Sequence, residues 1–341
     1  MQALMLSLES RIQVRRYSLP FRGPVRTAHG VWGVREGVFV RIEGADGSVG
    51  FGEAAPVPGF SAESVDEIEA AARGLGETAT EAAFDALPAQ MACLRGAIRA
   101  ARRDREQVPG RPSLGVAALL PAGAAALTNA PQMAEAGFRV FKWKVGVGDP
   151  ADELALLDDL CAALPSTARL RLDANGGWDR RRAERWLERC AERPVEFVEQ
   201  PVAREARGSE DLLQGLARDY PVPIALDESV AGDGDIERWL GMGWPGIFVI
   251  KPALLGEADA TLGLLAAARA PVVFSSALET GIGARASLFH AFRWEGEPRA
   301  LGFGAWPLFS DARFDGPAAA PFVRWEDVER IDPEAIWNAA G

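Results

Sequence analysis

The hydrophobic pattern changes about one third of the way along the chain. From about residue 113, short apolar runs alternate with helical stretches such as 149–164, 179–190 and 257–268. Strands that alternate with helices predict parallel βαβ units. The runs lie at 114–120, 138–145, 170–173, 195–199, 224–227, 247–251, 272–275 and, more weakly, 300–303.

Eight such runs over about 190 residues fit an α/β fold of the (β/α)-barrel type, near the lower end of its usual size. A doubly wound open sheet is the alternative. No Gly-x-Gly-x-x-Gly sequence follows the first run, so the usual signal of a dinucleotide site is missing.

The first hundred residues follow a different pattern. Residues 38–42 and 49–52 flank Asp46-Gly47 and predict a β-hairpin. An Ala-rich helical pattern begins near residue 61 and continues to about 105. We therefore expect three parts, namely an α+β domain over 1–108, a barrel over 109–304 and a tail over 305–341 that folds back on the first domain.

Composition narrows the class of protein. The 341 residues are 48% hydrophobic and 25% charged, with a net charge of −11, which argues against nucleic acid or an anionic membrane as the main partner. No apolar run approaches the roughly 18 residues of a membrane span. No signal peptide is visible in the first twenty residues, and the three cysteines have no Cys-x-x-Cys spacing, so a cytoplasmic protein is expected. The oligomeric state, monomer or homo-oligomer, is left open.

The basic residues are distributed unevenly. Of 37 Lys and Arg residues only three are lysines, namely Lys142, Lys144 and Lys251, and the other 34 are arginines. Arginine cannot lose its proton near neutral pH, whereas a lysine with a lowered pKa can. Two lysines within three residues therefore suggest amine chemistry at that place.

Polar residues end five successive runs, and their spacing matches one βα unit each. The intervals between them are 29, 26, 28 and 24 residues. Because the carboxyl ends of parallel barrel strands open on one face, these side chains should converge there. They are Lys144, Asp173, Glu199, Asp227 and Lys251.

Three carboxylates at one mouth repel each other, and a divalent cation relieves that repulsion. An all-oxygen donor set with open positions favours Mg²⁺, with Asp173, Glu199 and Asp227 as ligands. A lysine beside the metal and a second lysine can act as a general base, and the set suits removal of a proton α to a carboxylate, giving an enediolate held by the metal.

Each of these residues taken alone has a simpler explanation. A single acid at a strand end is more often a helix cap or a solvated charge. The joint pattern of three acids with every lysine of the chain beside them favours a site. Glu228 is left open as a supporting or helix-start acid. His29 and His290 are interpreted as structural, with reach of His29 to the mouth as a second possibility.

The motifs resemble the enolase superfamily, in its muconate lactonizing subgroup. That resemblance implies a modified TIM barrel with a capping domain built from the N-terminal part and the C-terminal tail. The matching motifs are Lys142-Trp143-Lys144, Leu172-Asp173-Ala174-Asn175, Val198-Glu199-Gln200-Pro201, Asp227-Glu228-Ser229 and Ile250-Lys251-Pro252.

Within that subgroup three further segments are similar to the o-succinylbenzoate synthase family. These are residues 20–37, 52–61 and 275–283. In the third segment, small residues and backbone N–H groups at a helix start can hold a substrate carboxylate, so Ser275, Ser276 and Gly281 become candidate substrate contacts.

The resemblance implies a Mg²⁺-dependent hydro-lyase of menaquinone or phylloquinone biosynthesis. The reaction would dehydrate 2-succinyl-6-hydroxy-2,4-cyclohexadiene-1-carboxylate to o-succinylbenzoate. Lys144 would abstract the α-proton, and Lys251 would stabilise the enediolate from the opposite face. Lys142 would lower the pKa of Lys144 and contact the substrate, and Arg171, two residues before Asp173, is a further substrate-binding candidate.

Rival activities in the same subgroup stay open. Two lysines on opposite faces of a carbon also suit an N-acylamino-acid racemase. A dipeptide epimerase is disfavoured because Ser275-Ser276-Ala277 stands where an Asp-x-Asp is usual. Muconate cycloisomerase is less favoured by the N-terminal segments. A catalytically silent binding barrel would have lost site residues, and none is missing.

Overall fold

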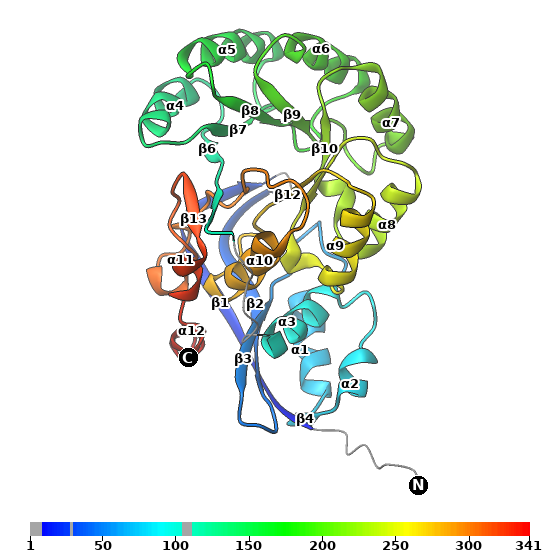
Figure 1. Cartoon of the computed structure of the whole chain (residues 1–341), viewed down its shortest axis with the longest axis vertical. Helices are drawn as coiled ribbons and strands as arrows, with labels where there is room; N and C mark the ends of the chain where they lie inside the picture. Colours follow the sequence, from blue (N-terminus) through cyan, green and yellow to red (C-terminus); the bar gives the residue numbers. More distant parts are fainter. Residues whose placement is uncertain (1–8, 28–29, 104–110) are drawn as a thin grey trace.

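The molecule consists of a barrel and an antiparallel sheet that lies against one side of it (Figure 1). The computed structural model describes residues 9–27, 30–103 and 111–341 of the chain. In the orientation of Figure 1 the first four barrel helices form the upper arc, the other three lie at the middle, and the helices of the antiparallel sheet lie below.

The barrel contains seven strands in one sheet, in the order β12-β11-β10-β9-β8-β7-β6. Every neighbouring pair is parallel, which confirms the predicted α/β barrel and excludes the open-sheet alternative with its reversal of strand order. The strands are β6 (Ala118–Leu120), β7 (Val140–Lys144), β8 (Arg169–Asp173), β9 (Val195–Glu199), β10 (Ile224–Leu226), β11 (Ile247–Ile250) and β12 (Val272–Phe274).

Helices cover the outside of this sheet (Figure 1). Their apolar faces pack on the outward side chains of the strands in one large core. The helices are α4 (Ala125–Glu135), α5 (Pro150–Ala163), α6 (Arg180–Cys190), α7 (Ser209–Asp219), α8 (Asp233–Gly241), α9 (Ala258–Ala267) and α10 (Gly281–Arg293), with short 3-10 turns η1 (Glu228–Val230) and η2 (Pro252–Leu254).

Two of the predicted runs take a different form. Residues 300–303 form no strand but close the barrel through two parallel bridges, Val116 to Leu301 and Ser275 to Gly302. The run 114–120 divides into β5 (Ser113–Gly115) and β6, because β5 pairs with a strand of the C-terminal tail while β6 pairs with β7. A local apolar pattern cannot distinguish these two partners.

The antiparallel sheet belongs to what we call the N-terminal unit. Its order is β3-β2-β1-β4, and it contains the predicted hairpin as β2 and β3. Helix α3 packs its apolar face on this sheet, and α1 begins at a capping box formed by Ser64 and Glu67. The elements are β1 (Ser10–Thr27), β2 (Gly30–Glu43), β3 (Val49–Ala54), α1 (Val65–Gly74), β4 (Thr78–Ala79), α2 (Glu81–Asp85) and α3 (Ala92–Arg103).

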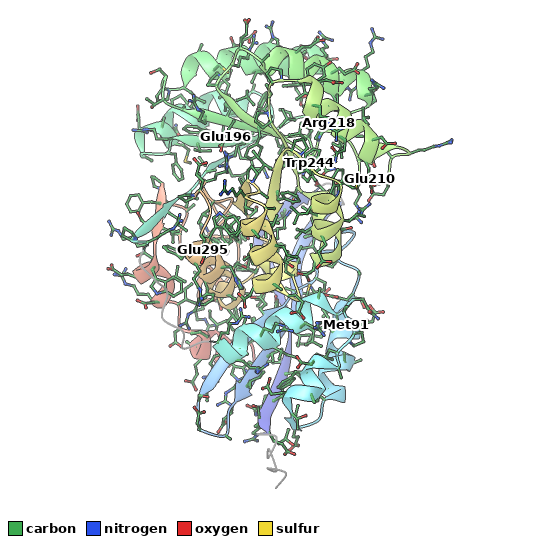
Figure 2. All side chains as sticks on the ribbon, turned by 45° about the vertical axis from the view of Figure 1, so that its right-hand side comes forward. Met91, Glu196, Glu210, Arg218, Trp244 and Glu295 are labelled. Carbon is green, nitrogen blue, oxygen red and sulfur yellow. The ribbon has the colours of Figure 1, made fainter. Side chains whose placement is uncertain are left out.

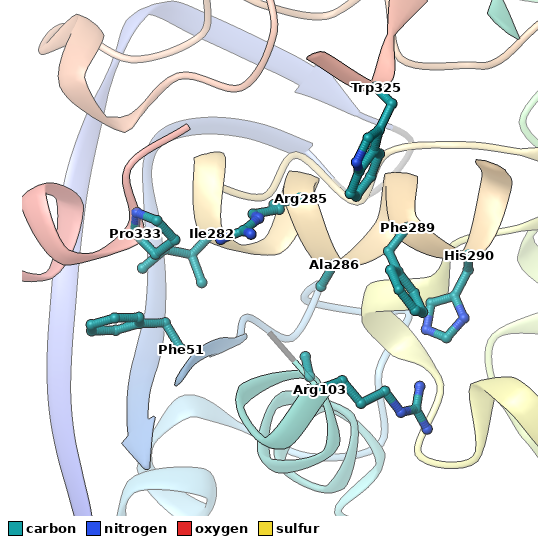
Figure 3. A pocket seen from close by; sticks show the side chains of 10 residues that line it. Phe51, Arg103, Ile282, Arg285, Ala286, Phe289, His290, Trp325 and Pro333 are labelled. Atoms are coloured by element: carbon teal, nitrogen blue, oxygen red, sulfur yellow. The ribbon is translucent and has the colours of Figure 1, made fainter. Parts of the chain in front are cut away.

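The C-terminal tail touches both parts. Its strand β13 (Phe322–Arg324) pairs with β5, and Trp337 lies in a cluster with Phe51 of β3 and Ile282 of α10. Figure 3 shows a pocket where these elements meet, with Phe51, Ile282, Trp325 and Pro333 around it. The remaining tail elements are η3 (Ala312–Phe314), α11 (Trp325–Glu329) and α12 (Pro333–Ala339). The division at residues 108 and 304 stays an interpretation.

The strand register determines which side chains enter the barrel. Partners in adjacent parallel strands point to the same side, and side chains alternate along each strand. The buried cluster Phe197, Ala225, Ile247, Val249 and Val273 therefore forms the barrel floor. No helix in the described part of the chain is long and apolar enough to cross a membrane.

The contact between β3 and α3 generates a test of stability. A Cβ atom at Gly52 would lie 1.9 Å from the backbone oxygen of Ala97. Gly52→Ala should therefore lower the free energy of unfolding by about 1–3 kcal/mol or more, measured by urea denaturation. Gly33→Ala, with nothing within 4 Å of its Cβ, is the matched control and should stay within about 0.5 kcal/mol of wild type. Equal midpoints for both variants would refute the close packing.

Candidate active site

The register brings the predicted chemical groups to one end of the barrel. Lys144 pairs with Asp173, and Asp173 pairs with Glu199. Asp227 and Lys251 are the first residues after β10 and β11, on the same side as Ala225 and Val249 two residues earlier. All five residues therefore lie at the carboxyl ends of neighbouring strands, where the barrel opens.

Lys142 lies between two of the carboxylates. Its Nζ is 2.9 Å from Oδ2 of Asp173 and 2.6 Å from Oε1 of Glu199. Burial lowers the pKa of Lys142, but the surrounding carboxylates outweigh burial and raise it. Burial and the neighbouring Asp173 raise the pKa of Glu199 to about 8. Lys142 is therefore held as an ammonium ion by the carboxylates.

The other two lysines differ in their surroundings. Lys251 donates to Asp227, and its Nζ lies 4.5 Å from the centre of the Phe60 ring. Lys144 is half-buried and has no hydrogen-bond or ion-pair partner within the described ranges. Of the three amines, Lys144 is thus the one whose nitrogen is available to a substrate atom.

A second layer of polar contacts holds the ends of β9 and β10. Gln200 is fully buried, and its Oε1 accepts from the backbone N–H groups of Asp227 and Ser229, each at 3.1 Å. Its Nε2 donates to Ser229 Oγ at 2.8 Å and to the Val202 carbonyl at 2.9 Å. Gln200 has a positive φ of 37°. Gln200 was not among the predicted site residues, and its position directly after the candidate ligand Glu199 is the sequence signal that could have identified it.

Glu228 completes the acidic cluster. Its Oε1 accepts from Asn175 Nδ2 at 3.1 Å, while its Oε2 is buried without a hydrogen-bond partner. Burial and the neighbouring Asp227 raise the pKa of Glu228 to about 7. Such an orphaned buried oxygen beside three carboxylates fits a place for a cation.

The donor chemistry fits Mg²⁺, since all of the side-chain donors are carboxylate oxygens. As the side chains lie, no group of three or more His, Cys, Asp or Glu in the described chain could hold a metal ion. In this arrangement the carboxylates form ion pairs with the ammonium groups of Lys142 and Lys251. The candidate ligands are nevertheless close neighbours along the mouth, since the same Lys142 Nζ contacts both Asp173 and Glu199.

Arg171 lies one layer deeper than the acids. It is 1% exposed and donates to Glu196 Oε2 at 2.8 Å and to the carbonyl of Ala300 at 2.6 Å. The register between β8 and β9 shifts at this point, which accommodates Glu196 as an extra residue beside Arg171. Figure 2 shows Glu196 in the barrel half of the molecule. These contacts give Arg171 a structural role under the mouth and no support as a substrate contact.

The segment after β12 contains the three predicted substrate contacts, of which Gly281 packs elsewhere. Ser275 and Ser276 are buried, and Ser276 Oγ donates to Glu279 at 2.7 Å. Gly281 faces the C-terminal tail, since a Cβ there would lie 2.8 Å from Ile336 Cδ1, so its predicted role in substrate binding gains no support.

The start of α10 is already bound within the protein. The N–H groups of Thr280 and Gly283 donate to the carboxylate of Glu53, at 3.0 and 2.9 Å. This corrects the expectation that these groups hold a substrate carboxylate, because an internal anion occupies them.

The described histidine, His290, lies away from the mouth. His290 lies on α10 with its Nδ1 3.4 Å from Asp259 Oδ1, in line with a structural role. The proposed reach of His29 falls outside the described residues.

Comparison with known proteins agrees with this geometry. Residues 125–320 match the family described as "Enolase C-terminal domain-like", and residues 9–92 match "MenC, N-terminal domain". The chain is 41% identical to an o-succinylbenzoate synthase of Thermosynechococcus vestitus, over 94% of this chain and 99% of the relative. It is 30% identical to a hydrophobic dipeptide epimerase of Roseobacter litoralis, over 66% and 71% of the two chains.

A solved structure supports the same placement. The o-succinylbenzoate synthase of Thermosynechococcus elongatus, complexed with Mg in its active site, superimposes with a TM-score of 0.81 at 37% identity. The superposition covers 96% of this chain and 99% of the other. The chain belongs to the enolase superfamily and, within it, to the o-succinylbenzoate synthase family.

Proposed function

We propose that this chain is an o-succinylbenzoate synthase, a Mg²⁺-dependent hydro-lyase. The observation that carries the proposal is the 41% identity to such a synthase along nearly the whole chain, N-terminal unit included. The barrel mouth supports it, since three acids and three lysines lie at the ends of five neighbouring strands.

The metal site comes from three neighbouring strand ends. Asp173, Glu199 and Asp227 would hold Mg²⁺, and Asn175 and Gln200 orient this set through Asp173 Oδ1 and the Asp227 N–H. When bound, Mg²⁺ supplies Lewis acidity for a substrate carboxylate. Lys142, with its raised pKa, stays charged beside the ligands and adds a second positive charge for that carboxylate.

The lysines carry the proton transfers. The Nζ of Lys144 takes the proton on the carbon α to the substrate carboxylate, leaving the electron pair on the substrate. As the C–O bond at the ring hydroxyl breaks, Lys144 returns that proton to the departing hydroxide, so that water leaves and the ring becomes aromatic. The ammonium of Lys251 balances the negative charge that develops on the substrate.

Substrate contacts remain part of the proposal. We assign them to Lys142 and to Ser275 and Ser276 of the segment after β12, and we leave Arg171 and Gly281 out because of their packing. We also propose a cytoplasmic enzyme for a small carboxylate substrate, in line with free thiols at all three cysteines and a net charge of −11.

The first prediction about activity concerns Lys144 as the general base. Purified protein should convert the cyclohexadiene substrate to o-succinylbenzoate with Mg²⁺, and EDTA should abolish the activity. Lys144→Arg should lower kcat about 10²–10⁴-fold, because a guanidinium cannot accept the α-proton near neutral pH. Arg139→Lys, an exposed cation beside β7, is the control and should keep wild-type kcat. Full activity of the Lys144 variant would remove Lys144 as the base.

The second prediction concerns the rival activity. Two lysines at one mouth also suit racemisation of N-succinyl amino acids, so both reactions should be measured on one preparation. We expect kcat/KM for dehydration to exceed that for racemisation, because loss of water makes the ring aromatic. A far higher racemase kcat/KM would favour the N-acylamino-acid racemase.

The third prediction concerns the metal. Glu199→Gln and Asp227→Asn should each weaken Mg²⁺ binding by about 100-fold or more in titration calorimetry, since residues that merely orient metal ligands already account for about 10–100-fold. Asp211→Asn, an exposed acid on α7, is the control and should bind Mg²⁺ as wild type does. Unchanged affinity in both mouth variants would contradict the assignment.

A further inference from the structure

A strained residue lies in the segment between β12 and α10. Leu278 has a φ of +62°, in the left-handed region that a branched apolar residue rarely adopts. Such a conformation persists only where the surroundings enforce it, and it often marks functional segments. We call residues 275–280 the β12 loop; it contains the proposed substrate contacts Ser275 and Ser276.

Contacts within the β12 loop account for part of this conformation. Ser276 Oγ accepts from the N–H of Leu278 at 2.9 Å and donates to Glu279 Oε2 at 2.7 Å. The same oxygen of Glu279 accepts from the N–H of Ala277 at 2.5 Å. These bonds close a tight turn, but they leave the carbonyl groups of Ala277 and Leu278 to other donors.

Arg35 of the N-terminal unit supplies those donors. It lies on β2 and is 2% exposed. Its guanidinium donates to the carbonyls of Leu278 at 3.1 Å and Ala277 at 3.2 Å. The same group donates to Ala55 and Pro56 at 2.6 and 2.7 Å, which fixes it to its own unit. The planar fork of arginine thus joins the strained turn to the N-terminal sheet.

Glu53 holds the other end of the β12 loop. Its carboxylate comes from β3 and accepts from the Thr280 N–H and the Gly283 N–H at the start of α10. Tyr17 donates to the same carboxylate at 2.5 Å. A Cβ at Gly283 would lie 2.8 Å from Glu53 Oε2, so this close approach requires glycine. An anion at a helix start is favoured by the helix dipole.

We propose that Arg35 and Glu53 are positioning residues, through which the N-terminal unit holds the β12 loop in its strained conformation and so sets substrate affinity. The inference rests on the proposed function, because it uses Ser275 and Ser276 as substrate contacts. The hydrogen bonds of Arg35 and Glu53 to the barrel go to residues 277–283 and not to the lysines or acids of the mouth, so the proton-transfer groups stay in place when either is changed.

The first test is Arg35→Lys. A lysine keeps the charge but cannot bridge four carbonyls, so the β12 loop should loosen. We expect KM for the cyclohexadiene substrate to rise about tenfold, with kcat within about twofold and unchanged Mg²⁺ affinity. Arg41→Lys, on the same strand but bonded to Gln13 and Glu43, is the matched control and should keep wild-type KM. An unchanged KM for Arg35→Lys, or a fall in kcat alone, would overturn the proposal.

The second test removes the strain itself. In the Arg35→Lys background, Leu278→Gly should return KM toward wild type, because glycine adopts positive φ without steric cost. Leu278→Ala removes the same side chain but keeps the strain, so it should not rescue KM. Equal effects of the two substitutions would show that backbone strain is not what Arg35 controls.

A third readout is independent of activity. Amide hydrogen exchange of residues 275–280 should speed up in Arg35→Lys, while exchange in β7 and β8 stays as in wild type. If the wild-type protein fails to dehydrate the substrate, the proposed function fails, and the exchange data still decide the inference. Should Arg35→Lys not fold, Glu53→Gln takes its place with the same readouts. Unchanged exchange in the β12 loop would refute the positioning role.

Discussion

The repulsion between carboxylates at the barrel mouth is the constraint on which the rest of the site depends. The register of three neighbouring strands places their acids side by side at the mouth, namely Asp173, Glu199 and Asp227. Burial of such a set is unfavourable unless positive charge lies among it. The structure supplies that charge with Lys142 and Lys251, whereas Lys144 forms no ion pair with any residue that the structure describes. Lys144, which lacks such a partner among the described residues, is the amine to which we assign the proton transfer.

Several residues around the mouth have a positive φ or are fully buried, and their contacts with the acidic cluster explain both features. Asn175 and Gln200 adopt positive φ directly after or near a candidate ligand, and both use their side chains to hold the acidic cluster. Arg171 is buried beneath, paired with Glu196. A buried guanidinium needs such a partner, which makes it a part of the barrel interior rather than of the open mouth.

The N-terminal unit contributes to the structure of the site through its hydrogen bonds to α10 and the β12 loop. Arg35 and Glu53 are buried ionic groups that make hydrogen bonds both within their own unit and to backbone groups of the barrel. Through these contacts the N-terminal unit touches a loop that it does not contain, and on our proposal it positions that loop. The proposed mechanism therefore divides the roles: the barrel strands position the groups for proton transfer, and the N-terminal unit positions the loop beside them.

Local pattern alone predicted the parallel βα repeat, its strand ends and the five groups of the mouth, because the repeat brings residues at one-unit spacing to the same face. The strand order of the structure then decided between a barrel and an open sheet. The tertiary structure decided what spacing cannot express. It closed the barrel at 300–303 through bridges, placed Gly281 against the tail, and filled the start of α10 with Glu53 from more than 200 residues away. The physical reason is that strand periodicity depends on neighbouring residues, whereas the partner of a buried charge or helix end depends on how distant segments pack.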